Sequence, residues 1–228
     1  MTECSAKISS IYHGSCVDGI GIRSVVFFSG CNMRCPFCHN PETLYADGEA
    51  RSLSDIINEI NKYKVYYKKK GGVTLSGGEP FLQLDFCIQL VKRLKEQNIN
   101  VIVETNGLIL SEELLSVVDG VRLDIKNVHE ENEISLLNTY APFLDLCKRL
   151  STPVTLTNVL VPTRNLNENS LNSLRILCDR YDYPIEFLAF RKTCVQKYRS
   201  LGIPFPYEYV PECSGKDVEK AKSIFFGE

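Results

Sequence analysis

The sequence contains no apolar run of about eighteen residues, the length that a membrane span needs, and its start lacks the charged and apolar segments of a signal peptide. We therefore expect a cytoplasmic protein with no membrane partner. The net charge is small, since 26 lysines and arginines face 28 aspartates and glutamates and give −2. Such a balance argues against broad nucleic-acid binding, so we expect no nucleic-acid partner.

Internal repeats and low-complexity segments are also missing, apart from a short lysine run at 68–70. The chain has 228 residues, of which 44% are hydrophobic and 24% charged, and this composition suits one globular domain. We expect a single domain over residues 1–228, with a core at about 8–190 and a C-terminal loop and helix at 191–228.

Short β-branched runs alternate with helix-period segments along most of the chain, which predicts six βα units around a parallel sheet. We expect helices at 53–66, 84–97 and 216–225, with Ser54 and Ser111 as N-caps. Cys87, Cys147 and Cys178 fall in helical stretches and are expected in the core. The predicted parallel strands are 24–28, 72–75, 100–104, 121–125, 154–161 and 184–188, preceded by an extra strand at 8–12.

Three cysteines, Cys31, Cys35 and Cys38, stand close together directly after the first of these parallel strands. Disulfides seldom persist in a reducing compartment, so this spacing indicates metal ligands. A loop of this kind can give three irons of a cubane one sulfur each and leave the fourth iron open. The alternative is zinc, but structural zinc needs four ligands and the nearest other donor, His39, adjoins Cys38. The spacing favours a single iron–sulfur cluster.

Polar motifs follow three other predicted strands. The motif SGGEP at 76–80 contains two glycines, which allow a backbone to approach a ligand closely, although such a pair alone is usually a turn. The motif ETNG at 104–107 would by itself be a strand end with a turn. Asp124 and Lys126 alternate with apolar residues and should both point into a barrel, unless they form a purely structural ion pair. All these motifs lie at the C-terminal ends of strands, where barrel enzymes assemble their sites.

Taken in order, the strings VDGIGIRSVVFFSGCNMRCPFCHNPET, GGVTLSGGEPFLQ, ETNG and RLDIK resemble the radical S-adenosylmethionine (radical SAM) enzymes. The resemblance is strongest to the pyruvate formate-lyase-activating group and implies an α/β fold, a partial and open (β/α)6 TIM-like barrel. It implies a [4Fe-4S] cluster on Cys31, Cys35 and Cys38, with S-adenosylmethionine on the open iron. The residues that it places at the cofactors are Phe37, His39, Asn40, Gly77, Gly78, Glu79, Glu104, Thr105, Asn106, Asp124 and Lys126, with Glu79 able to pair with a ligand ammonium.

The chain departs from the family pattern at three places. Thr157 stands where the activating enzymes usually carry an arginine, and Arg191 stands where they often have a histidine. Arg191 is therefore a candidate replacement cation. Ile20 takes the place of the usual proline in the DGPGIR segment. These changes affect the expected substrate more than the expected radical chemistry.

The resemblance implies an enzyme that cleaves S-adenosylmethionine to a 5′-deoxyadenosyl radical and installs a glycyl radical on a partner enzyme. It also implies flavodoxin or ferredoxin as the electron donor, and we expect a monomer. A second hypothesis is a radical SAM enzyme that acts on a small molecule, like 7-carboxy-7-deazaguanine synthase, although that group more often has aspartate after its last cysteine. A third is a noncatalytic iron–sulfur protein, which needs no inward Glu79, Asp124 or Lys126.

Overall fold

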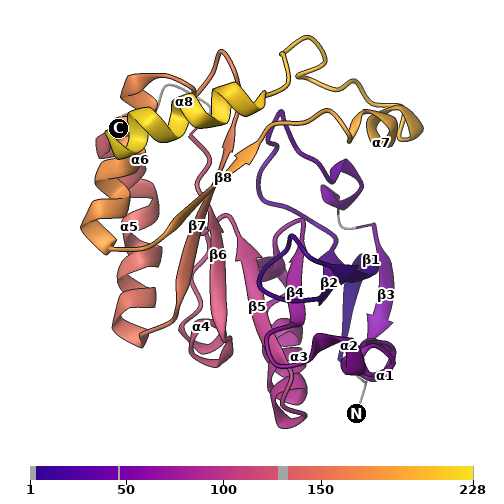
Figure 1. Ribbon diagram of the computed structural model, residues 1–228. Coiled ribbons are helices and arrows are strands. Elements are labelled where there is room, and N and C mark those ends of the chain that lie inside the picture. Colours follow the sequence, from indigo (N-terminus) through magenta and orange to yellow (C-terminus); the bar gives the residue numbers. More distant parts are fainter. Residues whose placement is uncertain (1–3, 46, 128–132, 228) are drawn as a thin grey trace.

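The computed structural model describes residues 4–45, 47–127 and 133–227 (Figure 1). Its centre is one open sheet of eight strands in the order β3-β1-β2-β4-β5-β6-β7-β8. The strands are β1 (Ser5–Ser15), β2 (Arg23–Phe28), β3 (Glu49–Ser52), β4 (Gly72–Gly77), β5 (Asn100–Thr105), β6 (Gly120–Asp124), β7 (Val154–Leu160) and β8 (Ile185–Ala189).

Neighbouring strands from β2 to β8 pair in parallel, while β1 pairs antiparallel with both β2 and β3. The prediction of an α/β partial barrel with six parallel strands is therefore confirmed. Strand β3 was not predicted, because its sequence EARS has no apolar alternation and none of its residues is fully buried.

Helices cover the outer face of this sheet (Figure 1). Among the helices that the structure describes, none combines the length and the apolar character that crossing a bilayer requires. The helices are α1 (Leu53–Asn61), α2 (Lys64–Tyr67), α3 (Leu84–Glu96), α4 (Glu112–Val117), α5 (Glu133–Leu150), α6 (Glu168–Tyr181), α7 (Val195–Ser200) and α8 (Gly215–Phe226), with short 3-10 helices η1 (Pro41–Thr43) and η2 (Pro80–Gln83).

The predicted helix at 53–66 is wrong in two respects. It is split into α1 and α2, because the chain turns between them. Tyr63 at the turn stacks on His13 with ring centroids 3.6 Å apart. The turn also buries Tyr67, whose hydroxyl lies 2.5 Å from that of Ser24. The N-cap of α1 is Ser52 rather than Ser54, since the Ser52 hydroxyl accepts the amide of Asp55. Ser111 caps α4 as predicted.

Two hydrophobic clusters stabilise the fold. The larger one lies between the sheet and its helices and includes Cys87, Cys147 and Cys178, which confirms their predicted core role. The smaller one includes Phe37, which lies in the loop that carries Cys31, Cys35 and Cys38 (the cysteine loop). It joins this loop to the C-terminal part of the chain through residues such as Tyr198 and Tyr207. The segment after residue 190 is therefore packed on the cysteine loop.

Arg23 is the largest buried polar side chain, at 1% exposure. Its guanidinium donates to Thr74 Oγ1 at 2.7 Å, to the carbonyl of Val73 at 2.6 Å and to Asn100 Oδ1 at 3.0 Å. Burial lowers the pKa of Arg23 to about 10. The side chain thus ties the start of β2 to β4 and β5.

We expect Arg23→Lys to lower the free energy of unfolding by about 1–3 kcal/mol, because an ammonium cannot reach the same acceptors and leaves buried oxygens without donors. Urea unfolding would measure the change. Arg93→Lys is the control, since that side chain is 62% exposed and should shift stability by less than about 0.5 kcal/mol. Equal midpoints for both variants would contradict this role of Arg23.

Candidate active site

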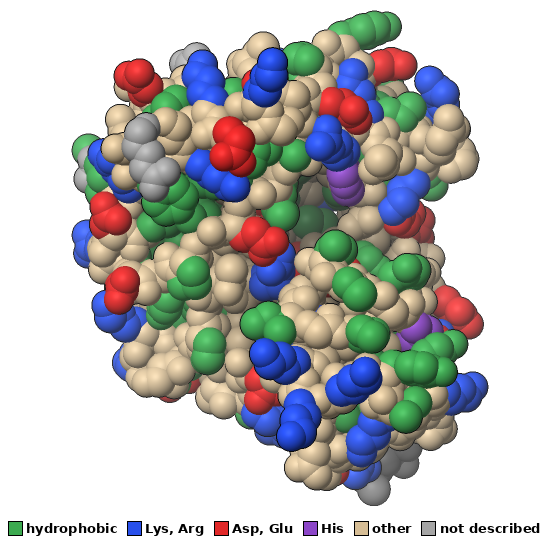
Figure 2. Space-filling model, in the orientation of Figure 1, with side chains coloured by type: hydrophobic (Ala, Val, Ile, Leu, Met, Phe, Trp, Pro, Cys, Tyr) green, Lys and Arg blue, Asp and Glu red, His purple; other side chains and the backbone are tan. Residues whose placement is uncertain are grey.

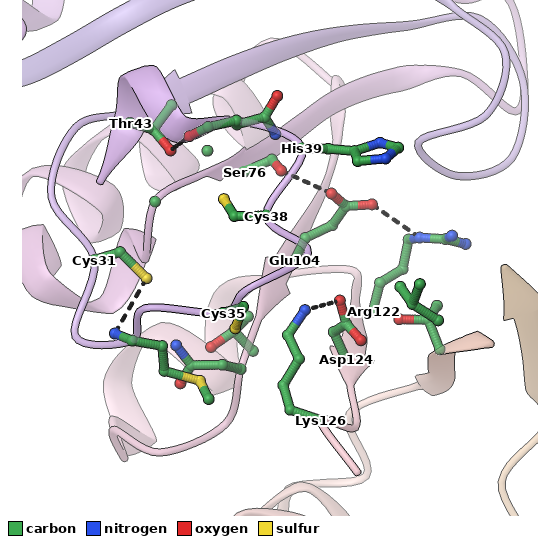
Figure 3. Close-up of a pocket in the computed structure, with 18 of the residues that line it drawn as sticks. Cys31, Cys35, Cys38, His39, Thr43, Ser76, Glu104, Arg122, Asp124 and Lys126 are labelled. Atoms are coloured by element: carbon green, nitrogen blue, oxygen red, sulfur yellow. Dashed lines mark hydrogen bonds and ion pairs between the residues drawn. The ribbon is translucent and has the colours of Figure 1, made fainter. Parts of the chain in front are cut away.

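A cleft of about 500 Å³ lies at the C-terminal ends of the parallel strands. It is visible as a hollow in the space-filling view (Figure 2). Figure 3 shows the cysteine loop on one side of it and the polar ends of β5 and β6 on the other. Of the sequence-predicted residues, the cleft is lined by Cys31, Cys35, Phe37, Cys38, His39, Asn40, Gly77, Gly78, Glu104, Thr105, Asn106, Asp124 and Lys126; Glu79 lies behind this lining.

The cysteine loop is held by backbone hydrogen bonds at its base. The amide of Gly30 donates to the carbonyl of Thr43 at 2.8 Å, and the amide of Glu79 donates to the carbonyl of Gly30 at 2.8 Å. Burial raises the pKa of all three cysteine thiols, that of Cys38 to about 11.

The two glycines of the SGGEP motif allow close backbone packing within the protein itself. A Cβ on Gly77 would lie 2.4 Å from the amide nitrogen of Phe28, and one on Gly78 would lie 2.0 Å from the carbonyl oxygen of Gly30. Gly77 also has a φ of 106°, which favours glycine. The glycines thus allow the end of β4 to pack against the start of the cysteine loop, and their lack of a side chain is required there whether or not a ligand approaches.

Glu79 is buried and its carboxylate is engaged within the protein. It accepts hydrogen bonds from Thr105 Oγ1 at 2.8 Å and from the amides of Asn106 and Phe81 at 2.9 and 3.1 Å. Burial raises the pKa of Glu79, and these donors oppose the shift. Glu79 therefore connects the end of β4 to the end of β5.

Asn106 links this connection to the cysteine loop. Its side-chain amide donates to Asn32 Oδ1 at 2.7 Å, next to Cys31. Its backbone amide donates a hydrogen bond to the Glu79 carboxylate. The cysteine loop, the SGGEP motif and the ETNG motif are therefore parts of one hydrogen-bonded unit.

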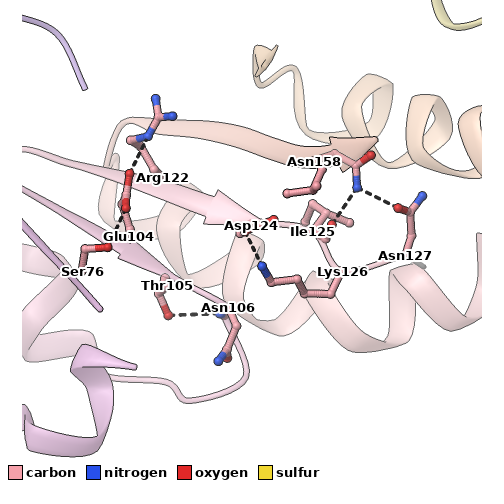
Figure 4. A network of polar contacts seen from close by, with 12 residues as sticks. Ser76, Glu104, Thr105, Asn106, Arg122, Asp124, Ile125, Lys126, Asn127 and Asn158 are labelled. Atoms are coloured by element: carbon pink, nitrogen blue, oxygen red, sulfur yellow. Dashed lines mark hydrogen bonds and ion pairs between the residues drawn. The ribbon is translucent and has the colours of Figure 1, made fainter. Parts of the chain in front are cut away.

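A row of polar and charged side chains from β4, β5 and β6 crosses the interior (Figure 4). Glu104 accepts from Ser76 Oγ at 2.7 Å and from Arg122 Nε at 2.9 Å, and Arg122 also contacts Glu186 at 2.8 Å. Burial raises the pKa of Glu104, while Ser76 and Arg122 lower it. The sequence analysis missed Arg122, although it has the same alternation as Asp124 and Lys126 and therefore points to the same face.

Asp124 and Lys126 both line the cleft, as their alternation predicted, and they form an ion pair there. Desolvation would lower the pKa of Lys126, but the Asp124 carboxylate raises it above its ordinary value. The Lys126 ammonium also lies 5.2 Å from the ring centroid of Phe37. The strand end is fixed by Asn158, whose amide donates to the carbonyl of Ile125 at 2.7 Å (Figure 4).

The C-terminal segment, from residue 191 onward, contacts the outer side of the cysteine loop. Tyr198 donates its hydroxyl to the carbonyl of Cys38 at 3.2 Å, and His39 Nε2 lies 2.6 Å from the carbonyl of Arg191. Lys197 Nζ donates to Asn40 Oδ1 at 2.9 Å. These contacts come from residues that sequence patterns do not connect to the loop.

The two substituted family positions have different surroundings. Thr157 lines the cleft and is buried, so the arginine expected there has no replacement at the same place. The suggestion that Arg191 supplies the cation is wrong: its guanidinium donates to the carbonyl of Cys213 at 2.7 Å and does not line the cleft. Arg122 is the arginine that does line it.

The donor set fits an iron–sulfur cluster with a bound ligand. Three thiols border one cleft, and Asp124 Oδ1 is buried there without a hydrogen-bond partner in the described part of the chain, which leaves an acceptor for a ligand. Across the described ranges, no three His, Cys, Asp or Glu side chains converge on a single metal ion. A cubane does not need such convergence, because each of three irons takes its own cysteine.

Comparison with known proteins agrees with this geometry. Residues 17–139 match the family model described as "4Fe-4S single cluster domain". The pyruvate formate-lyase-activating enzyme of Listeria monocytogenes serovar 1/2a is 32% identical over 241 residues, covering 98% of this chain and 97% of that one.

Two solved structures share the fold at low sequence identity. A radical SAM methyltransferase from Sphaerobacter thermophilus has a TM-score of 0.60 and 16% identity, covering 90% of this chain and 64% of its own. The protein anSMEcpe, solved with bound AdoMet and Cp18Cys peptide, has a TM-score of 0.57 and 16% identity, covering 87% and 56%.

The chain therefore belongs to the radical SAM enzymes, a class whose cofactors are a [4Fe-4S] cluster and S-adenosylmethionine, and within them to the pyruvate formate-lyase-activating family.

We expect Arg122→Met to destabilise the fold by about 2 kcal/mol at pH 7, because it leaves the Glu104 carboxylate buried beside an apolar side chain. Loss of the cation raises the pKa of Glu104 further, so the folded state binds a proton more readily than the unfolded state. The destabilisation should then shrink as the pH falls toward 5.

Urea unfolding at pH 5 and pH 7 measures this difference. Lys92→Met is the control, since its ion pair with Glu113 is exposed and should contribute less than about 1 kcal/mol at either pH. If Arg122→Met lowers the free energy of unfolding by the same amount at both pH values, the charge on Glu104 is not the cause of the destabilisation.

We expect Tyr198→Phe to loosen the cysteine loop, because it removes the hydrogen bond to the Cys38 carbonyl, worth about 1 kcal/mol. Amide hydrogen exchange over residues 31–44 should become about fivefold faster. Tyr209→Phe is the control, since Tyr209 is 94% exposed. Unchanged exchange in the Tyr198 variant would mean that the Tyr198 hydroxyl does not help to hold the loop.

Proposed function

We propose that this chain cleaves S-adenosylmethionine reductively and installs a glycyl radical on a partner enzyme. The observation that carries the proposal is the cleft, in which three cysteines face the polar ends of β4, β5 and β6 and which opens to the surface (Figure 2). The pyruvate formate-lyase-activating name of the Listeria relative supports a glycyl radical enzyme as the partner.

The [4Fe-4S] cluster and S-adenosylmethionine, when bound, supply a 5′-deoxyadenosyl radical that abstracts hydrogen. Cys31, Cys35 and Cys38 would hold three irons. The residues that would bind S-adenosylmethionine are those of the cleft lining that the motifs single out: Phe37, His39, Asn40, Gly77, Gly78, Glu104, Thr105, Asn106, Asp124 and Lys126.

Glu79 has a different role in this proposal. Because its carboxylate already accepts three hydrogen bonds from the protein, it positions Thr105 and Asn106 in preference to pairing with a ligand ammonium. Lys126 and Phe37 lie against each other and cover one side of the cleft, which helps to exclude water from the reacting groups.

The partner class is a protein or peptide rather than a small molecule. The structure of anSMEcpe with bound AdoMet and Cp18Cys peptide supports this, because a related fold accepts a peptide together with AdoMet. We also propose flavodoxin or ferredoxin as the electron donor, a monomeric state and a cytoplasmic location. The free thiols of the described cysteines suit a reducing compartment.

We expect the anaerobically reconstituted and reduced native chain to form 5′-deoxyadenosine from S-adenosylmethionine, and Cys35→Ala to lose at least about a hundredfold of this rate, because one iron loses its ligand. Cys4→Ser is the control, since Cys4 does not line the cleft, its sulfur accepts from Gln89 of α3 instead, and the variant should keep the native rate. Iron content and 5′-deoxyadenosine yield are measured together.

The partner is tested by adding a pyruvate formate-lyase and recording the electron paramagnetic resonance spectrum. A persistent glycyl radical signal, absent when the radical glycine is replaced by alanine, is the expected result. Production of 5′-deoxyadenosine without any such signal would contradict the glycyl radical step and leave the cleavage reaction in place.

A further inference from the structure

Strand β8 forms one edge of the sheet and pairs only with β7 among the described residues. The amide of Leu156 donates to the carbonyl of Pro184 at 2.8 Å, and the amide of Phe190 donates to the carbonyl of Leu160 at 3.1 Å. In a parallel ladder, alternate residues turn both backbone polar groups to the same side. Since Pro184 and Phe190 face β7, the residues Ile185, Phe187 and Ala189 face the open edge.

The backbone groups of these three residues have no hydrogen-bond partner within the part of the chain that the structure describes. Helix α8 does not supply one, because it packs on the outer face of β8, where the rings of Phe187 and Phe225 lie 5.2 Å apart. Apart from α8, the C-terminal segment forms a backbone hydrogen bond just past the strand, where the amide of Cys213 donates to the carbonyl of Phe190 at 3.0 Å. Among the described residues, no strand or loop is therefore hydrogen-bonded to the outer edge of β8 over residues 185–189.

This outer edge is continuous with the cleft. Leu188 and Ala189 line the cleft from β8, and Glu186, on the same face of the strand as Leu188, contacts Arg122. The Glu186 carboxylate is 48% exposed, so this face of the strand is open to the surface. A chain laid along β8 would thus run beside the space that holds the cysteines and the ends of β5 and β6.

An unpaired strand edge binds the main chain of an extended peptide, and its hydrogen bonds do not depend on the peptide's side chains. Such pairing also fixes which way each Cα points, since alternate residues face opposite sides of the sheet. Removing a hydrogen atom from a backbone glycine needs this kind of control, because the reacting atom belongs to the main chain.

We propose that the free edge of β8 is the docking strand for an extended, glycine-containing segment of the protein substrate. The segment pairs with the backbones of Ile185, Phe187 and Ala189 and turns its glycine Cα toward the cleft. This inference rests on the proposed function, and it adds where and in which conformation the substrate binds.

The test uses the native holoenzyme with S-adenosylmethionine and a blocked nine-residue peptide of valine and threonine with a central glycine. Amide exchange should slow at least tenfold at Ile185, Phe187 and Ala189 when the peptide is added. The amides of β3, at the other edge of the sheet, serve as the control and should not change.

A scan of the peptide by N-methylation gives the second readout. Methylation at alternate residues should weaken binding at least tenfold, because those amides face β8, whereas methylation at the intervening residues should change binding less than twofold. A uniform effect along the peptide, absence of protection on β8, or equal protection on β3 would overturn the proposal.

Self-association is a further outcome, in which a second copy of the chain occupies the edge. Protection of β8 that appears without peptide and grows with protein concentration would overturn the proposal in favour of that occupant. The formation of 5′-deoxyadenosine, measured without peptide in aliquots reduced with dithionite, distinguishes failure of the proposed function from failure of the docking strand. If no 5′-deoxyadenosine forms, the proposed function is refuted. If it forms but the peptide does not protect the amides of β8, only the docking strand is refuted.

Discussion

The site depends on close backbone packing between the end of β4 and the start of the cysteine loop. Gly78 and Gly30 approach so closely that no side chain fits between them, and the amide of Glu79 is bonded to the Gly30 carbonyl. From this contact the Glu79 carboxylate reaches on to Thr105 and Asn106, and Asn106 reaches back to Asn32. The position of the cysteines and the positions of the strand ends are thus set together.

Much of this arrangement could be predicted from the sequence, because it depends on local spacing and alternation. The cysteine gaps indicate a cluster, and the alternation of Asp124 and Lys126 places both in the interior. The same alternation would have found Arg122, which lines the cleft. The six parallel strands could be predicted because each is a short apolar run between helical segments.

Other features depend on contacts that no local pattern encodes. Tyr198 bonds to Cys38 across 160 residues of sequence, and Glu79 bonds to Asn106 across 27. The motif around Glu79 was identified, but the direction of its carboxylate depends on how η2 and β5 pack. Strand β3 and the break between α1 and α2 were missed for the same reason, since tertiary partners such as β1 and His13 determine them.

We propose that Cys31, Cys35 and Cys38 would hold a four-iron cluster whose remaining iron would bind S-adenosylmethionine in this cleft. The most direct test is the electron paramagnetic resonance spectrum of the reduced cluster with and without S-adenosylmethionine. The account predicts a spectrum that changes on addition of S-adenosylmethionine and broadens when the oxygen or nitrogen of its methionine part carries a magnetic isotope. A reduced cluster whose spectrum does not respond to S-adenosylmethionine would contradict it.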